Sequence, residues 1–250
     1  MIHRKLFERM SYACVNFAYP LGDKRYRVWA GVFFRPATIL TVTHAFSSTG
    51  KAITRQAEID PGQCYAWDAD GTIYRVQKVE FLPTGDIALV HTDQNGPANL
   101  PLGNPRALEI GDLIYLWAYP ITYEGYFRDR SPGGRYPYWG SWSVGWWEGP
   151  VAAGTGYDYA LLCPSMEGQS GSPVVAFQDG LPKVVGVLSA TFSVLQGGLL
   201  EQSMSYVSSV EHLEGRGPPP GPEDRIKAWL KAYGPALVGG AVIGAILAKG

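Results

Sequence analysis

A serine flanked by glycines lies in segment 167–173, which reads Glu-Gly-Gln-Ser-Gly-Ser-Pro. A serine hydroxyl becomes a strong nucleophile only when it is exposed, a base takes its proton and hydrogen-bond donors stabilise the oxyanion that forms. The glycines permit a tight turn that points the Gly168 and Ser170 amides into one small hole. The same residues also suit an ordinary turn before a strand. Catalysis at Ser170 therefore requires a base and a carboxylate elsewhere in the chain.

Two residues of the required types lie at the edges of predicted strands. His44 directly follows the β-branched and apolar run 38–43, whose end is a rigid platform from which an imidazole can face a cleft. It is also compatible with an ordinary core or surface histidine. Asp86 opens the apolar strand 86–91, a place where aspartate is rare unless it caps a turn or a partner holds it. The other acids nearby lie in polar or turn-like segments and are interpreted as solvated loop residues: Glu58, Asp60, Asp68, Asp70 and Asp93.

The wider pattern is that of a β-rich chain. Gly, Pro, Tyr and Trp are plentiful (31, 19, 15 and 8 residues), and helical runs are scarce. A Gly-, Pro- and Asn-rich linker is predicted at 92–111, between two β regions. The strands expected are 27–34, 38–43, 76–81, 86–91, 112–120, 174–177, 183–192 and 204–207, with a short helix near 209–214. The aromatic-rich stretch 117–147 is interpreted as a long hairpin, or alternatively as a surface for a partner or a membrane interface.

Composition excludes several classes of protein. With 250 residues the chain can form one large domain or two small ones, and a net charge of -1 without a dense cationic face gives no case for nucleic acid. Cys14, Cys64 and Cys163 are odd in number and widely spaced, which argues against disulfides and a zinc site and fits a reducing, cytoplasmic compartment. Residues 1–9 show no secretory signal. No cofactor or metal is expected.

In the order His44, Asp86, Ser170, the chain resembles the chymotrypsin-like (trypsin-like) serine peptidases. The matching motifs are Thr-Val-Thr-His at 41–44, Gly-Asp-Ile-Ala-Leu-Val at 85–90 and Gly-Gln-Ser-Gly-Ser-Pro at 168–173, and 111–120 is similar to the strand that often opens the second barrel. The resemblance covers about residues 11–213. It implies an all-β fold of two antiparallel six-stranded β-barrels with the site between them. The expected domains are 1–98 with His44 and Asp86, 99–214 with Ser170, a linker at 215–222 and a C-terminal α-helix at 223–250.

The resemblance also implies a role for each site residue. Ser170 would attack the scissile carbonyl, His44 would take its proton, and Asp86 would fix the imidazole tautomer. The Gly168 and Ser170 N–H groups would form the oxyanion hole. The substrate-binding positions would be Pro164 and the edge-strand residues Ser189, Ala190 and Thr191.

Departures from the family pattern narrow the expected specificity. Gln169 stands where digestive members carry an aspartate that pairs with a freshly cut N-terminus, so the chain is closer to viral and intracellular bacterial members than to secreted ones. Pro164 replaces the acid that cleavage after Lys or Arg would need. No histidine occurs in 187–190, so a preference for Gln or Glu is unsupported. A small or apolar residue before the cut is the default expectation.

The C-terminal segment has a pattern of its own. Small residues recur every fourth position at Ala236, Gly240, Gly244 and Ala248. The charge-free run after Lys231 is about 17 residues, which is at the lower limit for spanning a bilayer. Residues 229–248 are therefore expected to associate with a membrane, or else to dock on a partner or a second copy, or to form a plain ordered helix.

Two functions follow from these features. The first is a serine endopeptidase that acts on polypeptides through an acyl-enzyme, of the viral-polyprotein or membrane-tethered kind. The alternative is a catalytically silent protease-like scaffold whose C-terminal helix binds or perturbs membranes.

Overall fold

The computed structural model of this chain describes residues 2–23, 25–118, 141–151, 157–165, 168–196 and 199–215. A helix, α1 (Ile2–Tyr12), precedes the strands. In the described residues the strands are β1 (Cys14–Gly22), β2 (Arg25–Arg35), β3 (Thr38–Thr41), β4 (Tyr65–Trp67), β5 (Ile73–Phe81), β6 (Ala88–Thr92), β7 (Leu113–Ala118), β8 (Ser141–Pro150), β9 (Tyr159–Leu162), β10 (Pro173–Gln178), β11 (Leu181–Gln196) and β12 (Leu199–Ser209). Four 3₁₀ turns accompany them: η1 (His44–Phe46), η2 (Pro61–Gln63), η3 (Pro105–Ala107) and η4 (Val210–Glu214).

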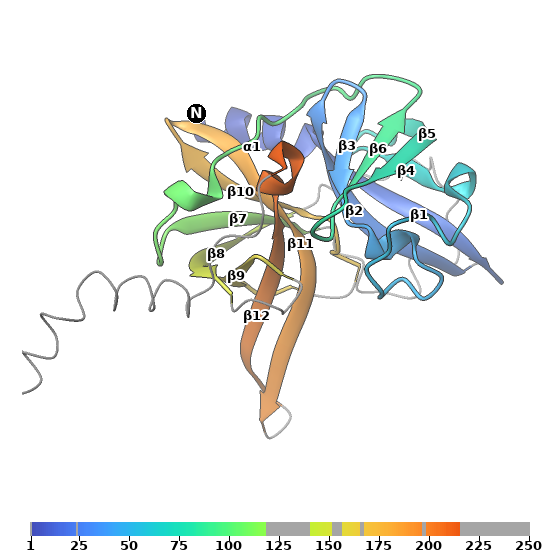
Figure 1. Cartoon of the computed structure of the whole chain (residues 1–250). Helices are drawn as coiled ribbons and strands as arrows, with labels where there is room; N and C mark the ends of the chain where they lie inside the picture. Colours follow the sequence, from blue (N-terminus) through green and yellow to red (C-terminus); the bar gives the residue numbers. More distant parts are fainter. Residues whose placement is uncertain are drawn as a thin grey trace, which may run out of the picture.

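The strands close into two antiparallel barrels. The first has the order β1-β2-β3-β6-β5-β4 and the second has the order β10-β11-β12-β9-β8-β7. Figure 1 shows the barrels side by side, with the β11–β12 hairpin extending beyond the second one. The predicted chymotrypsin-like fold of two six-stranded barrels is therefore confirmed.

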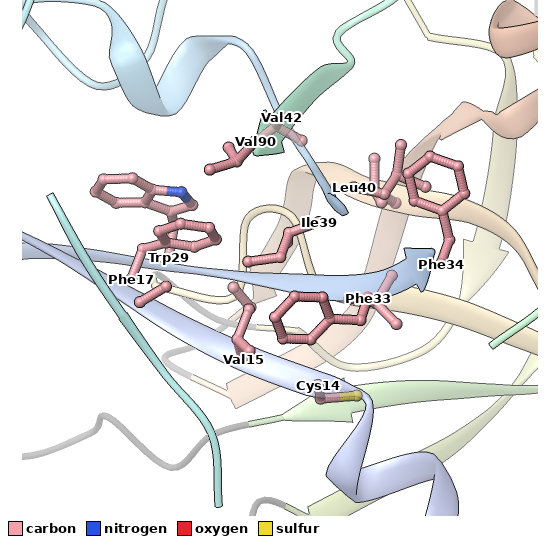
Figure 2. Packing of buried hydrophobic residues seen from close by; sticks show 14 of the residues in the cluster. Cys14, Val15, Phe17, Trp29, Phe33, Phe34, Ile39, Leu40, Val42 and Val90 are labelled. Atoms are coloured by element: carbon pink, nitrogen blue, oxygen red, sulfur yellow. The ribbon is translucent and has the colours of Figure 1, made fainter. Parts of the chain in front are cut away.

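Aromatic rings fill the first barrel. Phe17 stacks on Trp29 with ring centroids 5.1 Å apart, and Phe46 makes an edge-to-face contact with Trp29 at 5.4 Å between ring centroids. Figure 2 shows Phe17, Trp29 and Phe33 packed around aliphatic side chains from neighbouring strands, among them Val15 of β1 and Ile39 of β3. Rings of this size bury much apolar surface each. The first barrel therefore gives β3 and β6 a rigid foundation.

The second barrel has its own core. Trp147 packs against Tyr159 at 4.5 Å between ring centroids. The other buried apolar residues of this core are Ile114, Leu116, Leu161, Cys163, Val174, Ala176, Val185, Leu188 and Val207. Several apolar residues of this half, including Trp117 and Val210, pack instead into the cluster that fills the first barrel.

The structure differs from the sequence-based expectations at two places. Helix α1 is not expected from the sequence, and its Phe7 contacts Tyr115 and Phe177 of the second barrel at 5.3 and 6.5 Å between ring centroids. The interpretation of Asp68 as a solvated residue is wrong. Asp68 is buried, and its carboxylate accepts hydrogen bonds from the Tyr74 hydroxyl at 2.6 Å and from two backbone N–H groups of its own turn.

Other expectations fall partly or wholly on residues that are not described. β7 and β8 do pair, with Trp117 opposite Trp142, while the aromatic residues between 119 and 140 lie outside the described part. The predicted C-terminal helix 223–250 also lies outside it. Within the described residues, no helix combines the length and the apolar character that crossing a bilayer requires.

Candidate active site

The pairing of β3 with β6 brings His44 and Asp86 together. In this register Thr41 is opposite Ala88. His44 follows the end of β3 and Asp86 precedes the start of β6, so both residues leave the barrel at the same edge. Nδ1 of the His44 ring lies 2.6 Å from Oδ2 of Asp86. Because a carboxylate only accepts, the imidazole donates this bond from Nδ1 and keeps Nε2 for another partner.

Hydrogen bonds hold the buried Asp86 carboxylate on both oxygens. Oδ1 accepts the backbone N–H of Thr43 at 2.9 Å, the Thr43 hydroxyl at 2.7 Å and the backbone N–H of His44 at 3.0 Å. Oδ2 accepts the Ser189 hydroxyl besides the His44 ring. Burial opposes ionisation, but the bonds from His44, Ser189 and Thr43 outweigh it and hold the pKa of Asp86 below its usual value. The carboxylate therefore stays ionised next to the imidazole.

The Ser170 loop is fastened to both barrels. The carbonyl of Ser170 accepts the N–H of Ala30 from β2 at 2.7 Å, and the N–H of Gly171 donates to Leu188 of β11 at 2.7 Å. Gly168 and Gly171 have φ angles of +89° and +80°, a region that disfavours side chains. A Cβ on Gly171 would lie 2.1 Å from the carbonyl oxygen of Ala30. Only glycine therefore permits this close approach.

His44, Gly168 and Ser170 line one cavity of about 800 Å³. Its walls come from both barrels, with Tyr26 to Trp29 on one side and Leu188 to Thr191 on the other. Within the described residues, neither the Gly168 nor the Ser170 amide donates to a backbone carbonyl. These two N–H groups, which are predicted to form the oxyanion hole, therefore make no hydrogen bond to a backbone carbonyl of the described residues.

Ser170 lines the same cavity as His44, but no hydrogen bond joins the Ser170 hydroxyl to the His44 ring in this structure. Such bonds are often long in ligand-free enzymes and tighten when substrate binds.

The predicted substrate-binding residues divide into two groups. Ser189, Ala190 and Thr191 line the cavity, and Ser189 additionally supports Asp86. Pro164 is exposed and is not among the described residues that line the cavity. Next to it, the Ser165 hydroxyl bonds with Thr191 and, at 2.7 Å, with Ser205.

Sequence reasoning misses several supporting groups. The Thr43 hydroxyl donates to the Asp86 carboxylate. The Ser208 hydroxyl accepts the backbone N–H of Asp86 at 3.1 Å. Tyr157 also lines the cavity, and burial, together with the charge of Asp86, raises the pKa of its phenol. Thr43 is next to the predicted base His44 in the sequence, so its position could have suggested a supporting role. Nothing in the sequence around Ser208 or Tyr157 suggests such a role.

The thiols are poor alternatives to Ser170, the predicted nucleophile. All three cysteines are free and buried, and burial raises the pKa of Cys64 to about 12 and that of Cys163 to about 11. A thiol becomes a good nucleophile when its pKa falls instead. In the described part of the chain, no group of three or more His, Cys, Asp or Glu side chains has an arrangement suited to a metal ion.

The sequence pattern of the trypsin-like peptidase domain matches residues 30–187, a range that contains His44, Asp86 and Ser170. The chain belongs to this family. Comparison with curated proteins gives no match.

Solved structures share the fold of this trypsin-like domain. An inactive serine-to-alanine form of Rv3671c from M. tuberculosis is 14% identical, with a TM-score of 0.53 over 84% of this chain and 87% of that one. Deg5 is 16% identical, with a TM-score of 0.57 over 85% of this chain and 90% of that one.

A serine-to-alanine variant of the HtrA-type protease AlgW, solved with a tripeptide, is 15% identical, with a TM-score of 0.59. The match covers 85% of this chain but only 61% of the AlgW chain. At 14 to 16% identity, the similarity to these three structures shows a shared fold and nothing more.

Proposed function

We propose that this trypsin-like domain is a serine endopeptidase that cleaves polypeptides through an acyl-enzyme. The observation that carries the proposal is the shared cavity. It contains Ser170 and an imidazole whose Nδ1 is bound to a buried carboxylate, so that Nε2 remains for the hydroxyl proton. Family membership supports the same chemistry.

The proposed steps use only groups of this chain and water. Oγ of Ser170 attacks the scissile carbonyl carbon while His44 takes the hydroxyl proton, and the Gly168 and Ser170 amides stabilise the oxyanion. Collapse of this intermediate breaks the C–N bond, and His44 gives its proton to the leaving amine. A water molecule, deprotonated by His44, then hydrolyses the ester and releases Ser170. Asp86 holds the tautomer and stabilises the imidazolium.

Fluorophosphonate labelling tests the assignment of Ser170. Wild type is expected to be labelled, and Ser170→Ala is expected to lose the label. Ser172→Ala is a matched control, because this serine lies two residues away and its buried hydroxyl has no partner among the described residues. Equal labelling of wild type and Ser170→Ala would reject the nucleophile. A folded wild type without labelling or peptidase activity would favour the silent scaffold.

We further propose that residues 229–248 attach the protease to a membrane facing a reducing, cytoplasmic compartment. The stripe of small residues from Ala236 to Ala248 and the charge-free run around it support this attachment. Flotation with phosphatidylcholine vesicles should recover the full chain but not a chain ending at Pro222. Equal recovery would reject attachment through this segment, and a shift to dimers without flotation would show self-association instead.

A further inference from the structure

A second buried histidine, His212, lies behind the proposed site. It belongs to η4, and its side chain is only 2% exposed. Nε2 of the ring lies 2.8 Å from Oδ2 of Asp158, and Nδ1 lies 2.9 Å from the Thr84 hydroxyl. Since Asp158 can only accept, Nε2 donates to it and Nδ1 accepts from Thr84 in the neutral ring. The imidazole thus links the second barrel to the loop before β6.

The segment Thr84–Asp86 lies directly against this ring. A Cβ added to Gly85, whose φ is +67°, would be 2.4 Å from Cδ2 of His212. The next residue is Asp86, whose backbone N–H donates to Ser208 at 3.1 Å. The contact with His212 therefore ends one residue before the carboxylate that orients His44.

The two sides of this loop are held differently. On the first-barrel side, the Arg55 guanidinium donates to the carbonyls of Leu82 and Gly85 at 3.2 and 2.6 Å. On the second-barrel side, Asp158 fixes the His212 ring, and Asp158 itself accepts the Ser209 N–H at 2.7 Å. The loop is therefore clamped between Arg55 and His212.

We propose that His212 is a positioning residue for the peptidase, and this rests on the proposed function. By binding Thr84 and packing on Gly85, it keeps the Asp86 carboxylate behind His44 while Ser170 is held by the other barrel. Displacements of even an ångström at a reacting group cost large factors in rate. His212 does not line the cavity, so it acts through Asp86 and not on the substrate.

Turnover per labelled active site tests the proposal. Thr84→Val removes one exposed hydroxyl and should lower kcat about fivefold, the worth of about one hydrogen bond. His212→Ala loses both bonds and should lower kcat at least tenfold. His212→Gln can donate to Asp158 and accept from Thr84, and Thr84→Ser keeps the hydroxyl, so both should restore most of the activity. KM should not change, because the cavity lining is intact.

His91→Ala is the matched control, since His91 lies on β6 away from the loop and should keep wild-type turnover. A folded Thr84→Val with wild-type kcat would overturn the proposal. So would a rise in KM alone, or a His212→Gln variant as impaired as His212→Ala. If His212→Ala does not fold, the two Thr84 variants and His212→Gln still test whether His212 positions Asp86.

Amide hydrogen exchange gives a readout that does not need activity. The N–H groups of Thr43 and His44 donate to Asp86 Oδ1, so both should exchange faster in Thr84→Val than in wild type or His91→Ala. Unchanged exchange would reject the clamp even in an active enzyme. If the wild type resists fluorophosphonate while exchange responds as expected, the proposed function fails and the clamp remains.

Discussion

The Asp86 carboxylate has different partners on its two oxygens. Oδ1 accepts the N–H and hydroxyl of Thr43 and the N–H of His44, while Oδ2 accepts the His44 ring N–H and the Ser189 hydroxyl. A buried charge is tolerated only when such bonds compensate for lost hydration. The same bonds that keep Asp86 ionised also fix the position of the His44 ring.

This arrangement predicts a specific acid sensitivity. The pKa of Asp86 is lowered on folding, so its contribution to stability is present above its unfolded pKa of about 3.9 and is lost as pH falls through the folded value. Asp86→Asn should therefore be less stable than wild type at pH 7, and the gap in the free energy of unfolding should shrink at pH 3. Urea unfolding at both pH values measures it, and a constant gap would contradict it.

The same substitution should reduce kcat by about 10⁴-fold, the loss measured for an aspartate-to-asparagine change in another triad peptidase. Turnover of a peptide substrate by the folded variant checks this expectation. A loss smaller than tenfold would show that Asp86 does not orient the base.

Residue types and local context are enough to identify some of this site but not the rest. His44, Asp86 and Ser170 can be found because each breaks the pattern of an apolar strand or a glycine turn. Ser208 and Thr84 cannot, because their partners are 122 and 128 residues away in sequence and only the closed barrels bring them close. Asp68 is misread for a related reason, since its partner Tyr74 is on a strand whose inward face the local sequence does not reveal.

The Ser170 loop depends on glycine for its course. It connects β9 to β10 and crosses close to β2, with Gly171 against the Ala30 carbonyl and the Thr41 hydroxyl. Its two barrel contacts fix Ser170 from both sides. The position of the hydroxyl therefore depends on backbone shape more than on side-chain packing.

Gly171→Ala is expected to disrupt this loop. Its φ of +80° and a Cβ 2.1 Å from a backbone oxygen add a steric clash to the conformational strain. Gly180→Ala is the control, because it has a φ of +75° but nothing within 4 Å, so it should cost only about 1–2 kcal/mol of strain. Thermal unfolding and labelling compare them. If Gly171→Ala and Gly180→Ala lost equal stability and labelling, the close packing around Gly171 would not be needed for the position of Ser170.

Elements differ in how well the sequence predicts them. The strands that carry the site follow clear β-branched and aromatic runs, and η4 lies where a short helix is expected. α1 is missed because its apolar residues, such as Phe7 and Met10, stand among charged ones, and it is stabilised by packing on distant strands. The role of η4 is missed as well, since His212 looks like any histidine near a helix end.

At the scale of the whole molecule, the two barrels each supply half of the proposed chemistry. The first provides the base and its carboxylate, and the second provides the nucleophile. Backbone and side-chain bonds cross between them at Ala30–Ser170, Asp86–Ser208 and Thr84–His212. The alignment of the site is therefore a property of the barrel interface.

The charge of the cavity predicts a substrate preference. Arg27 and Lys51 line it, and no carboxylate does among the described lining residues. If the acyl side of a peptide runs along β11, its leaving side passes Arg27 and Lys51, so peptides with Asp or Glu just after the cut should be cleaved faster than those with Lys. Lys51→Gln should reduce this advantage about threefold at low salt, whereas Lys78→Gln, whose lysine lies outside the cavity, should not. Cleavage rates of matched peptides measure the effect, and an equal loss in both variants would refute it.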